Sequence, residues 1–177
     1  MRYPLFLDVT GQSVVVIGGG TVATRKIRTL LAARARVTII GPKATPFLRQ
    51  HASRPSDHGR TGGTPVPRVR WLRRNYRSGD LRGARLVIAA TDDLGVNARV
   101  CAEAKRRRLL VNCVAPPAAG NFIVPSLVHR GGITLAISTD GASPAFAKRL
   151  RRDLERFLGD AYPALLKRMA ANRKKRR

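Results

Sequence analysis

The segment at residues 13–23 constrains the fold more than any other part of the chain. Residues 13–17 read SVVVI and run directly into glycines, a pattern typical of a strand buried on both faces of a parallel sheet. Residues 21–33 then place apolar side chains at helical spacing, with most of the charged ones on the other side. The sequence therefore predicts a strand, a tight glycine turn and a helix.

The turn itself carries a G-x-G-x-x-A motif. In a strand–turn–helix setting, Gly18 permits the tight turn, Gly20 lets a pyrophosphate approach the backbone, and Ala23 lets the helix pack against the strand. The helix N-terminus, at Thr21 and Val22, offers free N–H groups and a positive dipole end to phosphates. These residues predict a dinucleotide site. The alternative is a glycine turn with a purely structural role.

Strands and helices alternate along the next part of the chain, which implies right-handed βαβ units. The fold class predicted is α/β, a Rossmann-like doubly wound parallel sheet followed by a small α+β segment and C-terminal helices. The further elements expected are strands at 36–40, 68–72, 85–90 and 109–113, helices at about 44–51 and 96–107, and, after a linker at 115–120, strands at 122–125 and 133–138 and a helix opened by Ser143 and Pro144.

These changes in the pattern of predicted strands, helices and linkers divide the chain into three expected parts. They are a dinucleotide-binding domain at 1–113 with an exposed, aperiodic insertion at 53–67, a segment at 114–142, and a C-terminal helical segment with a basic tail at 143–177.

The positions after two strands complete the predicted cofactor site. The second strand ends in Ile40-Gly41-Pro42-Lys43 and lacks the acidic residue that would hold ribose hydroxyls. Lys43 either favours a 2′-phosphate or is a plain surface cation, and backbone groups near Pro42 can hold the ribose; NAD and NADP both stay open. Thr91 and Asp92 follow a later strand, which places them near the cofactor. The alternative is that Asp92 and Asp93 cap the next helix, and both roles are compatible.

The charge of the chain is extreme. Lys and Arg number 35 against 10 Asp and Glu, a net charge of +25, which favours a polyanionic partner: nucleic acid, anionic lipid, or a ligand with many carboxylates or phosphates. Aromatic residues are only 5% and no stacking platform is interleaved with the basic residues, which counts against nucleic acid.

The chain shows no sign of a membrane or metal partner. No apolar run approaches the ~20 residues of a membrane helix, and the N-terminal residues do not read as a signal peptide. Cys101 and Cys113 form no CxxC pair, and His51, His58 and His129 have no ligand spacing, so no bound metal is expected. A reducing, cytoplasmic location follows.

Several motifs together resemble the precorrin-2 dehydrogenase family, the dehydrogenase and ferrochelatase module of siroheme synthase. The matching stretches are YPLFLD at 3–8, the region 14–31 with its GGG and ATRK motifs, 87–93 with Asn97, VN at 111–112, NFIVPSLV at 121–128, and GASP at 141–144 leading into AKRL at 147–150.

The resemblance implies an NAD-dependent oxidation of precorrin-2 to sirohydrochlorin, and in some members the insertion of iron or cobalt. It also implies a homodimer built through the segment at 114–142, with the active site at the junction with the Rossmann domain. The substrate carries carboxylates around its rim, which a cleft lined with Arg and Lys would hold.

The expected substrate-binding residues are polar and basic residues at positions that match the family. The alternative for each of the two basic residues among them is a solvated surface charge. The expected residues are Asn121, Ser138, Thr139, Ser143, Lys148 and Arg149.

One position departs from the family pattern. Members usually carry an Asp shortly after the Asn-Val strand end, and here that position is Ala115, whose methyl group neither accepts a proton nor binds a metal. Chelatase activity is therefore doubtful. His129 and Asp140 are the two candidates to replace the acid; otherwise His129 is a helix-end residue and Asp140 a turn former. The alternatives to the enzyme are a non-catalytic dinucleotide- or tetrapyrrole-binding module and a basic nucleic-acid-binding protein.

Overall fold

The structure is a computed structural model that describes residues 2–53 and 69–175. The chain divides into two compact units, one comprising Phe6–Ile123 and the other Met1–Leu5 with Val124–Arg177. No helix in the described ranges is both long and apolar enough to cross a membrane.

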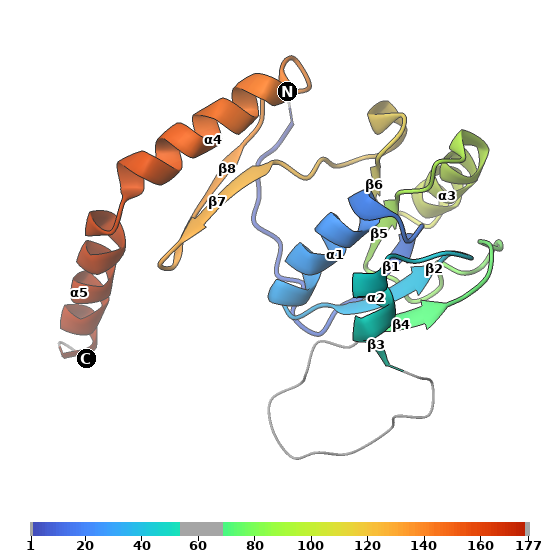
Figure 1. Ribbon diagram of the computed structural model, residues 1–177, viewed down its shortest axis with the longest axis horizontal. Coiled ribbons are helices and arrows are strands. Elements are labelled where there is room, and N and C mark those ends of the chain that lie inside the picture. The colour runs from blue at the N-terminus through green and yellow to red at the C-terminus, as the bar shows by residue number, and fades with distance from the viewer. Residues whose placement is uncertain (1, 54–68, 176–177) are drawn as a thin grey trace. The chain divides into compact units, whose positions relative to one another are not determined.

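The first unit is a parallel sheet of six strands in the order β3-β4-β2-β1-β5-β6 (Figure 1). Apart from the two-residue edge strand β3, this is the strand order of a dinucleotide-binding Rossmann fold, and it confirms the predicted fold class. The strands are β1 Ser13–Ile17, β2 Arg36–Ile40, β3 Ala52–Ser53, β4 Val69–Leu72, β5 Leu86–Ala89 and β6 Leu110–Cys113, and the helices are α1 Thr21–Ala32, α2 Pro46–His51 and α3 Leu94–Arg106.

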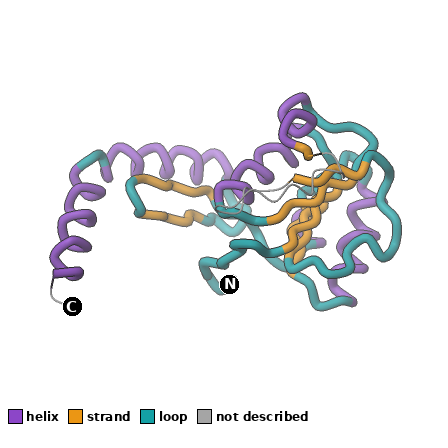
Figure 2. Tube along the Cα trace, turned by 90° about the horizontal axis from the view of Figure 1, so that it is seen from below, coloured by secondary structure: helices purple, strands orange, loops and turns teal. Residues whose placement is uncertain are grey.

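Helices cover both faces of this sheet (Figure 2). Val14 and Val16 of β1 pack toward α1 and α2, whereas Val15 and Ile17 pack toward α3. Because alternate residues of β1 face opposite layers and both layers are apolar, the whole strand reads as one hydrophobic run.

The central strands end level with one another. Ile17, the last residue of β1, pairs with the last residues of β2 and β5, and the register continues outward to the ends of β4 and β6. The residues that follow these strands therefore gather along one edge of the sheet. The last residues of the strands form one row across the sheet: Leu72, Ile40, Ile17, Ala89 and Cys113.

The first unit extends to Ile123, beyond the boundary at 113 that the sequence suggested. The reason is that residues 117–123 fold back onto β6: the Asn121 amide accepts from Val111 N and donates to Leu109 O, at 2.7 and 2.9 Å, and Phe122 packs against the core beside α1. The insertion expected at 53–67 lies outside the described residues, except for Ser53 in β3.

The second unit is an antiparallel pair, β7 Ser126–Arg130 and β8 Ile133–Ile137, followed by α4 Pro144–Leu158 and α5 Ala161–Lys175. Its small core joins the two strands to α4 through Val128, Ile137 and Ala147. The Ser143 hydroxyl accepts from Phe146 N at 3.1 Å and caps α4, as predicted.

Two local predictions in this region are wrong. Residues 122–125 are not a strand, because Pro125 has no N–H to donate and Phe122 is bound to the first unit instead; the strand begins at Ser126. His129 is not a helix-end residue: it lies within β7, and its Nδ1 is 2.8 Å from Oγ1 of Thr134 on β8.

Candidate functional site

A cleft of about 670 Å³ lies at the carboxyl ends of β1, β2 and β5. In an open parallel sheet this edge is where ligands bind, at the point where the strand order reverses; here that point is β1, between β2 and β5. The walls of the cleft are the glycine turn at 18–20, residues 41–45 after β2, Asn75 and Tyr76 after β4, residues 90–93 after β5, and Val96 and Arg99 of α3.

The three glycines of the turn have different roles. Gly18 has φ +107°, and a Cβ there would lie 2.3 Å from the carbonyl oxygen of Ala90; at Gly19 a Cβ would lie 2.3 Å from the carbonyl oxygen of Lys43. At Gly20 a Cβ would meet no atom of the described residues within 4 Å. The fold itself requires the first two glycines, whereas the third leaves open space at the cleft.

The N-terminus of α1 borders that open space. Gly20 is its N-cap, no side chain in the described ranges caps it, and its first turn contains no acidic residue. The first N–H groups of a helix have no intrahelical acceptor and favour an anion. The glycine turn, the bare helix end and the cleft therefore fit the diphosphate of a dinucleotide.

The wall after β2 contains no carboxylate. Ile40 is buried, and the carbonyl of Gly41 accepts from Trp71 Nε1 at 2.9 Å. Thr45 braces this wall, because its N–H donates to Gly19 O at 3.0 Å and its hydroxyl lies 2.8 Å from that of Thr24. Lys43 is exposed and lines the cleft.

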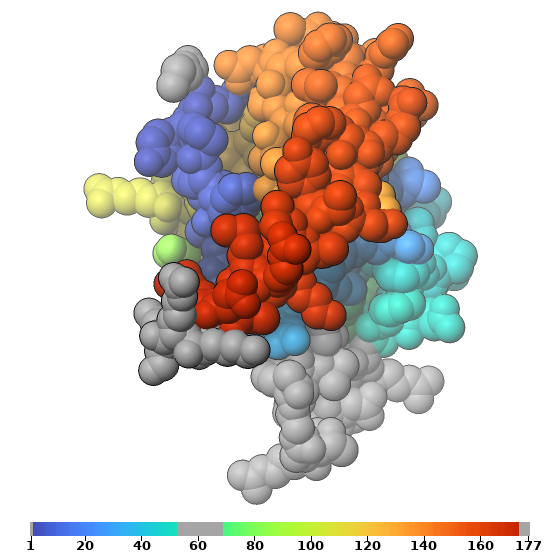
Figure 3. Space-filling model, turned by 90° about the vertical axis from the view of Figure 1, so that its left-hand side faces the viewer, coloured from blue at the N-terminus to red at the C-terminus, as the bar shows by residue number. Residues whose placement is uncertain are grey.

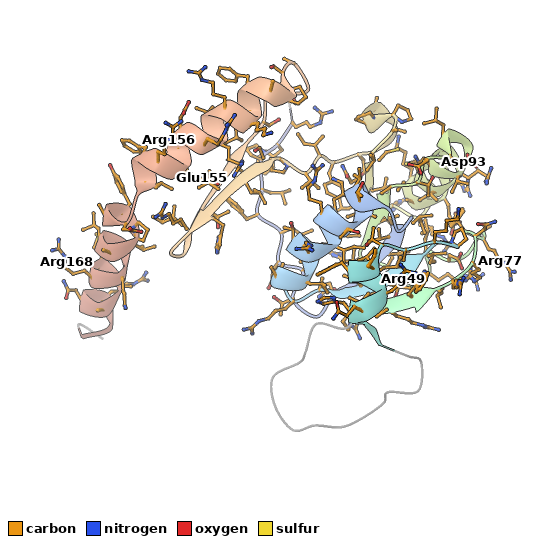
Figure 4. The ribbon with its side chains drawn as sticks, in the orientation of Figure 1. Arg49, Arg77, Asp93, Glu155, Arg156 and Arg168 are labelled. Carbon is orange, nitrogen blue, oxygen red and sulfur yellow. The ribbon has the colours of Figure 1, made fainter. Side chains whose placement is uncertain are left out.

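A single buried amide organises the wall after β5. Asn97 is fully buried, and its Oδ1 accepts from Thr91 N and Oγ1 at 3.2 and 2.8 Å. Its Nδ2 donates to Thr91 O at 3.0 Å and to Ala115 O at 3.1 Å. Asp93 caps α3 by accepting from Val96 N at 2.9 Å (Figure 4), and Asp92 is exposed. The loop therefore has the geometry for both predicted roles, because it lines the cleft and caps α3.

Sequence reasoning missed Asn97 as a site residue. The signal was an amide next to Val96 on the apolar side of a predicted helix, where a polar group needs buried partners. Those partners belong to two loops, so only the folded chain reveals them.

The loop after β4, which brings Asn75 and Tyr76 to the cleft, is held by two carboxylates. Glu103 of α3 accepts from Tyr76 Oη and, at 3.1 Å, from Gly79 N, and Arg107 Nε lies 2.8 Å away. Asp80 forms a two-point ion pair with Arg74 at 2.7 and 2.8 Å. Arg77, labelled in Figure 4, lies on this same loop.

Burial by itself would raise the pKa of Glu103, but the hydrogen bonds from Tyr76, Gly79 and Arg107 outweigh it and lower the pKa below its ordinary value. Burial raises the pKa of Tyr76, so its hydroxyl keeps its proton and donates it to Glu103.

The predicted cofactor residues gather at one place. The cleft is lined by Gly18, Gly20, Pro42, Lys43, Thr91 and Asp92. Thr21 and Val22 are exposed in the first turn of α1, and Ala23 is fully buried against the sheet, as its packing role requires.

The other predicted site residues belong to the second unit, apart from Asn121. Asp140 lies in a left-handed turn at φ 53°, with Arg2 NH1 2.5 Å from its Oδ1 and Ser138 Oγ accepting from its N–H at 3.1 Å. The Thr139 hydroxyl bonds the backbone of Ser143 at 3.3 Å. The turn at 138–143 thus brings four predicted polar groups together; whether they bind substrate stays a prediction.

Lys148 and Arg149 are exposed on α4, and Arg149 lies 3.8 Å from Asp153. The amide of Asn121 bonds the backbone of Val111 in β6 and of Leu109 just before it. Across residues 2–53 and 69–175, no three His, Cys, Asp or Glu side chains group as a metal ion requires. Cys101 and Cys113 are both buried free thiols.

Comparison with known proteins agrees with this geometry. The family described as putative NAD(P)-binding matches residues 5–126, and that described as sirohaem biosynthesis protein central matches residues 130–156. Precorrin-2 dehydrogenase of Bacillus subtilis is 31% identical over 173 residues, covering 98% of this chain and 99% of its own length. The chain belongs to the precorrin-2 dehydrogenase and siroheme synthase family.

Other relatives point the same way. Siroheme synthase of Nitrosospira multiformis is 39% identical over 92% of this chain, but the chain spans only 33% of that protein. The solved structure of SirC, a precorrin-2 dehydrogenase, has a TM-score of 0.77 and 32% identity and covers 94% of this chain and 76% of its own. Together with the open glycine cradle, these matches support NAD as the cofactor of the cleft.

The position that departs from the family pattern lies beside this cleft wall. Ala115 is half-buried, and its carbonyl oxygen accepts from Asn97 Nδ2 and lies 3.3 Å from the Cys113 thiol. Its side chain is a methyl group, so it supplies neither a base nor a metal ligand.

Proposed function

We propose that this chain oxidises precorrin-2 to sirohydrochlorin with NAD, within siroheme synthesis. The observation that carries the proposal is the cleft whose third glycine, Gly20, leaves space that no atom of residues 2–53 and 69–175 fills, in a chain related to precorrin-2 dehydrogenases along nearly its whole length. The bound nicotinamide supplies a hydride acceptor.

The chain contributes positioning more than acid–base chemistry. The substrate loses a hydride to the cofactor and a proton to a base or to water, and Ala115 is unable to take that proton. His129 and Asp140 are the candidates; the Asp140 carboxylate already pairs with Arg2, which leaves His129, with a ring nitrogen besides the one beside Thr134, as the less engaged of the two. Metal insertion is not part of the proposed function.

The net charge of +25 supports a substrate rich in carboxylates. Lys148 and Arg149 are exposed in the first half of α4, the helix that follows the polar turn at 138–143 in the chain. Arg149 and the Ser138 and Ser143 hydroxyls offer the donors that carboxylates accept from, whereas the Thr139 hydroxyl already bonds the Ser143 backbone.

We propose further that the protein works as a homodimer in the cytoplasm. On α5, Tyr162, Leu165, Leu166 and Met169 form an apolar stripe at helical spacing and are between 40 and 62% exposed. Figure 3 shows the surface of α4 and α5 in orange and red. Apolar side chains gathered in this way favour a protein partner. The free thiols Cys101 and Cys113 suit a reducing compartment.

The test is to mix the purified protein with precorrin-2 and NAD and to follow NADH and sirohydrochlorin by absorbance. Formation of both products in equal amounts supports the enzyme, and tight binding of both ligands without turnover shows a non-catalytic module instead. Adding ferrous or cobaltous ion to the product tests chelation, which is expected to proceed no faster than without protein.

A further inference from the structure

We infer that Asn97 is a positioning residue that joins the loop after β5 to the segment after β6 and thereby sets the nicotinamide half of the cleft. The inference rests on the cleft binding a nicotinamide dinucleotide and not on the identity of the tetrapyrrole. It extends the site to a residue that lines no part of the cleft.

The amide of Asn97 is used to its full capacity. An Asn side chain has two N–H donors and an oxygen with two lone pairs, and the two donors go to Thr91 O and Ala115 O while the oxygen accepts from the Thr91 backbone and hydroxyl. All four distances lie between 2.8 and 3.2 Å, and the residue is 0% exposed. Both orientation and position of the side chain are therefore determined.

No other polar group in the described ranges makes this connection. The last backbone bond between the two strand ends is Val114 N to Ala89 O, at 2.9 Å. Beyond it, Ala90 N turns back to Ile17 O on β1, and no backbone hydrogen bond among the described residues links 90–93 with 115–116. Among the described residues, only the side chain of Asn97 therefore links the two loops by hydrogen bonds.

The half of the dinucleotide that this tie affects follows from the strand order. The glycine turn and the end of β2 hold the pyrophosphate and the adenosine, and the other half of the fold receives the second nucleotide. Thr91, which lines the cleft, follows β5 in that second half. A displaced Thr91 loop should therefore disturb the nicotinamide end and leave the adenosine end intact.

The chemistry of the amide is specific. Asn97→Asp keeps the shape but removes both donors and places a carboxylate against the carbonyls of Thr91 and Ala115. Thr91→Val removes the hydroxyl that lies 2.8 Å from the Asn97 oxygen and 2.9 Å from Asp93 O, and it keeps the bonds of Asn97 to the Thr91 backbone. Val100→Ala, on the same helix, opens a space in the core and leaves the amide untouched, since Val100 is 0% exposed and packs in the layer between α3 and the sheet.

The experiment measures the dissociation constants of NAD and of ADP by calorimetry for the four proteins, well below their unfolding temperatures. Asn97→Asp is expected to raise the dissociation constant of NAD by about tenfold or more, which corresponds to about 1.4 kcal/mol of binding free energy. The dissociation constant of ADP should change by less than about twofold. Thr91→Val should raise the dissociation constant of NAD as well, but by a smaller factor. Val100→Ala should lower the melting temperature and leave the dissociation constants of both NAD and ADP unchanged.

Equal weakening of NAD and ADP in step with lost stability would show that Asn97 only supports the fold. Unchanged NAD affinity in folded Asn97→Asp and Thr91→Val would also overturn the inference. If Asn97→Asp fails to fold, Asn97→Ser takes its place in the comparison, because Thr91 itself lines the cleft. A wild-type protein that binds neither ligand would overturn the cofactor site itself, whereas wild-type binding with unaffected variants would refute the role of Asn97 alone.

Discussion

Gly20→Asp separates the needs of the fold from those of the ligand. A Cβ at this position meets no atom of the described residues within 4 Å, and its φ of −76° is open to any residue. Aspartate is also a better N-cap than glycine by a few tenths of a kcal/mol, and its charge suits the helix N-terminus. The variant should therefore fold with at least the stability of the wild type.

Dinucleotide binding should be lost in the same variant. The new carboxylate would lie where the diphosphate approaches the turn, and two unit charges about 5 Å apart repel by about 3.3 kcal/mol at an effective dielectric constant of about 20. That energy corresponds to a loss of affinity of about 10²-fold, before any steric term is added.

The assay is calorimetric titration with NAD beside a thermal melt followed by circular dichroism. Gly18→Ala is the contrasting variant, because its Cβ would lie 2.3 Å from the carbonyl oxygen of Ala90 at a φ of +107°; it should lower the melting temperature. A folded Gly20→Asp protein with undiminished NAD affinity would refute the placement of the diphosphate.

Three further outcomes are expected. Lys43→Glu should weaken NADP by about tenfold relative to NAD, because a 2′-phosphate loses its counter-charge; Arg85→Glu, at the opposite end of β5, is the matched control, and an equal effect of both variants would contradict a local role. The lowered pKa of Glu103 stabilises the fold above its ordinary pKa of 4.5, and this contribution disappears as the pH falls through the lower value in the folded state; Glu103→Gln should flatten the acid limb of melting temperature against pH, and an unchanged slope would exclude Glu103. Ala115→Asp should raise NADH formation if a missing base limits the rate, by up to about 10²-fold; an unchanged rate would show that the proton leaves by another route.

The sequence by itself determined the elements whose cause is local. The run at 13–17 predicted β1 with its observed bounds, Ser13–Ile17, because a strand buried on both faces needs only consecutive apolar residues. The glycine turn, the Ser143 cap and the wall residues Pro42, Lys43, Thr91 and Asp92 followed from spacing, since the ends of parallel strands meet at one edge of a sheet.

The tertiary structure decided what depends on partners distant in sequence. The segment at 122–125 has β-forming residues, yet Phe122 packs against the first unit and the strand starts at Ser126. The difference between Gly18 and Gly20 appeared only in the folded chain, where Ala90 lies beside Gly18 and a Cβ at Gly20 would have no described atom within 4 Å. The role of Asn97 became visible only when the fold placed the carbonyls of two separate loops beside its amide. Hydrophobic spacing encodes which face of an element is buried, whereas the partner of a buried polar group is set by how the elements come together.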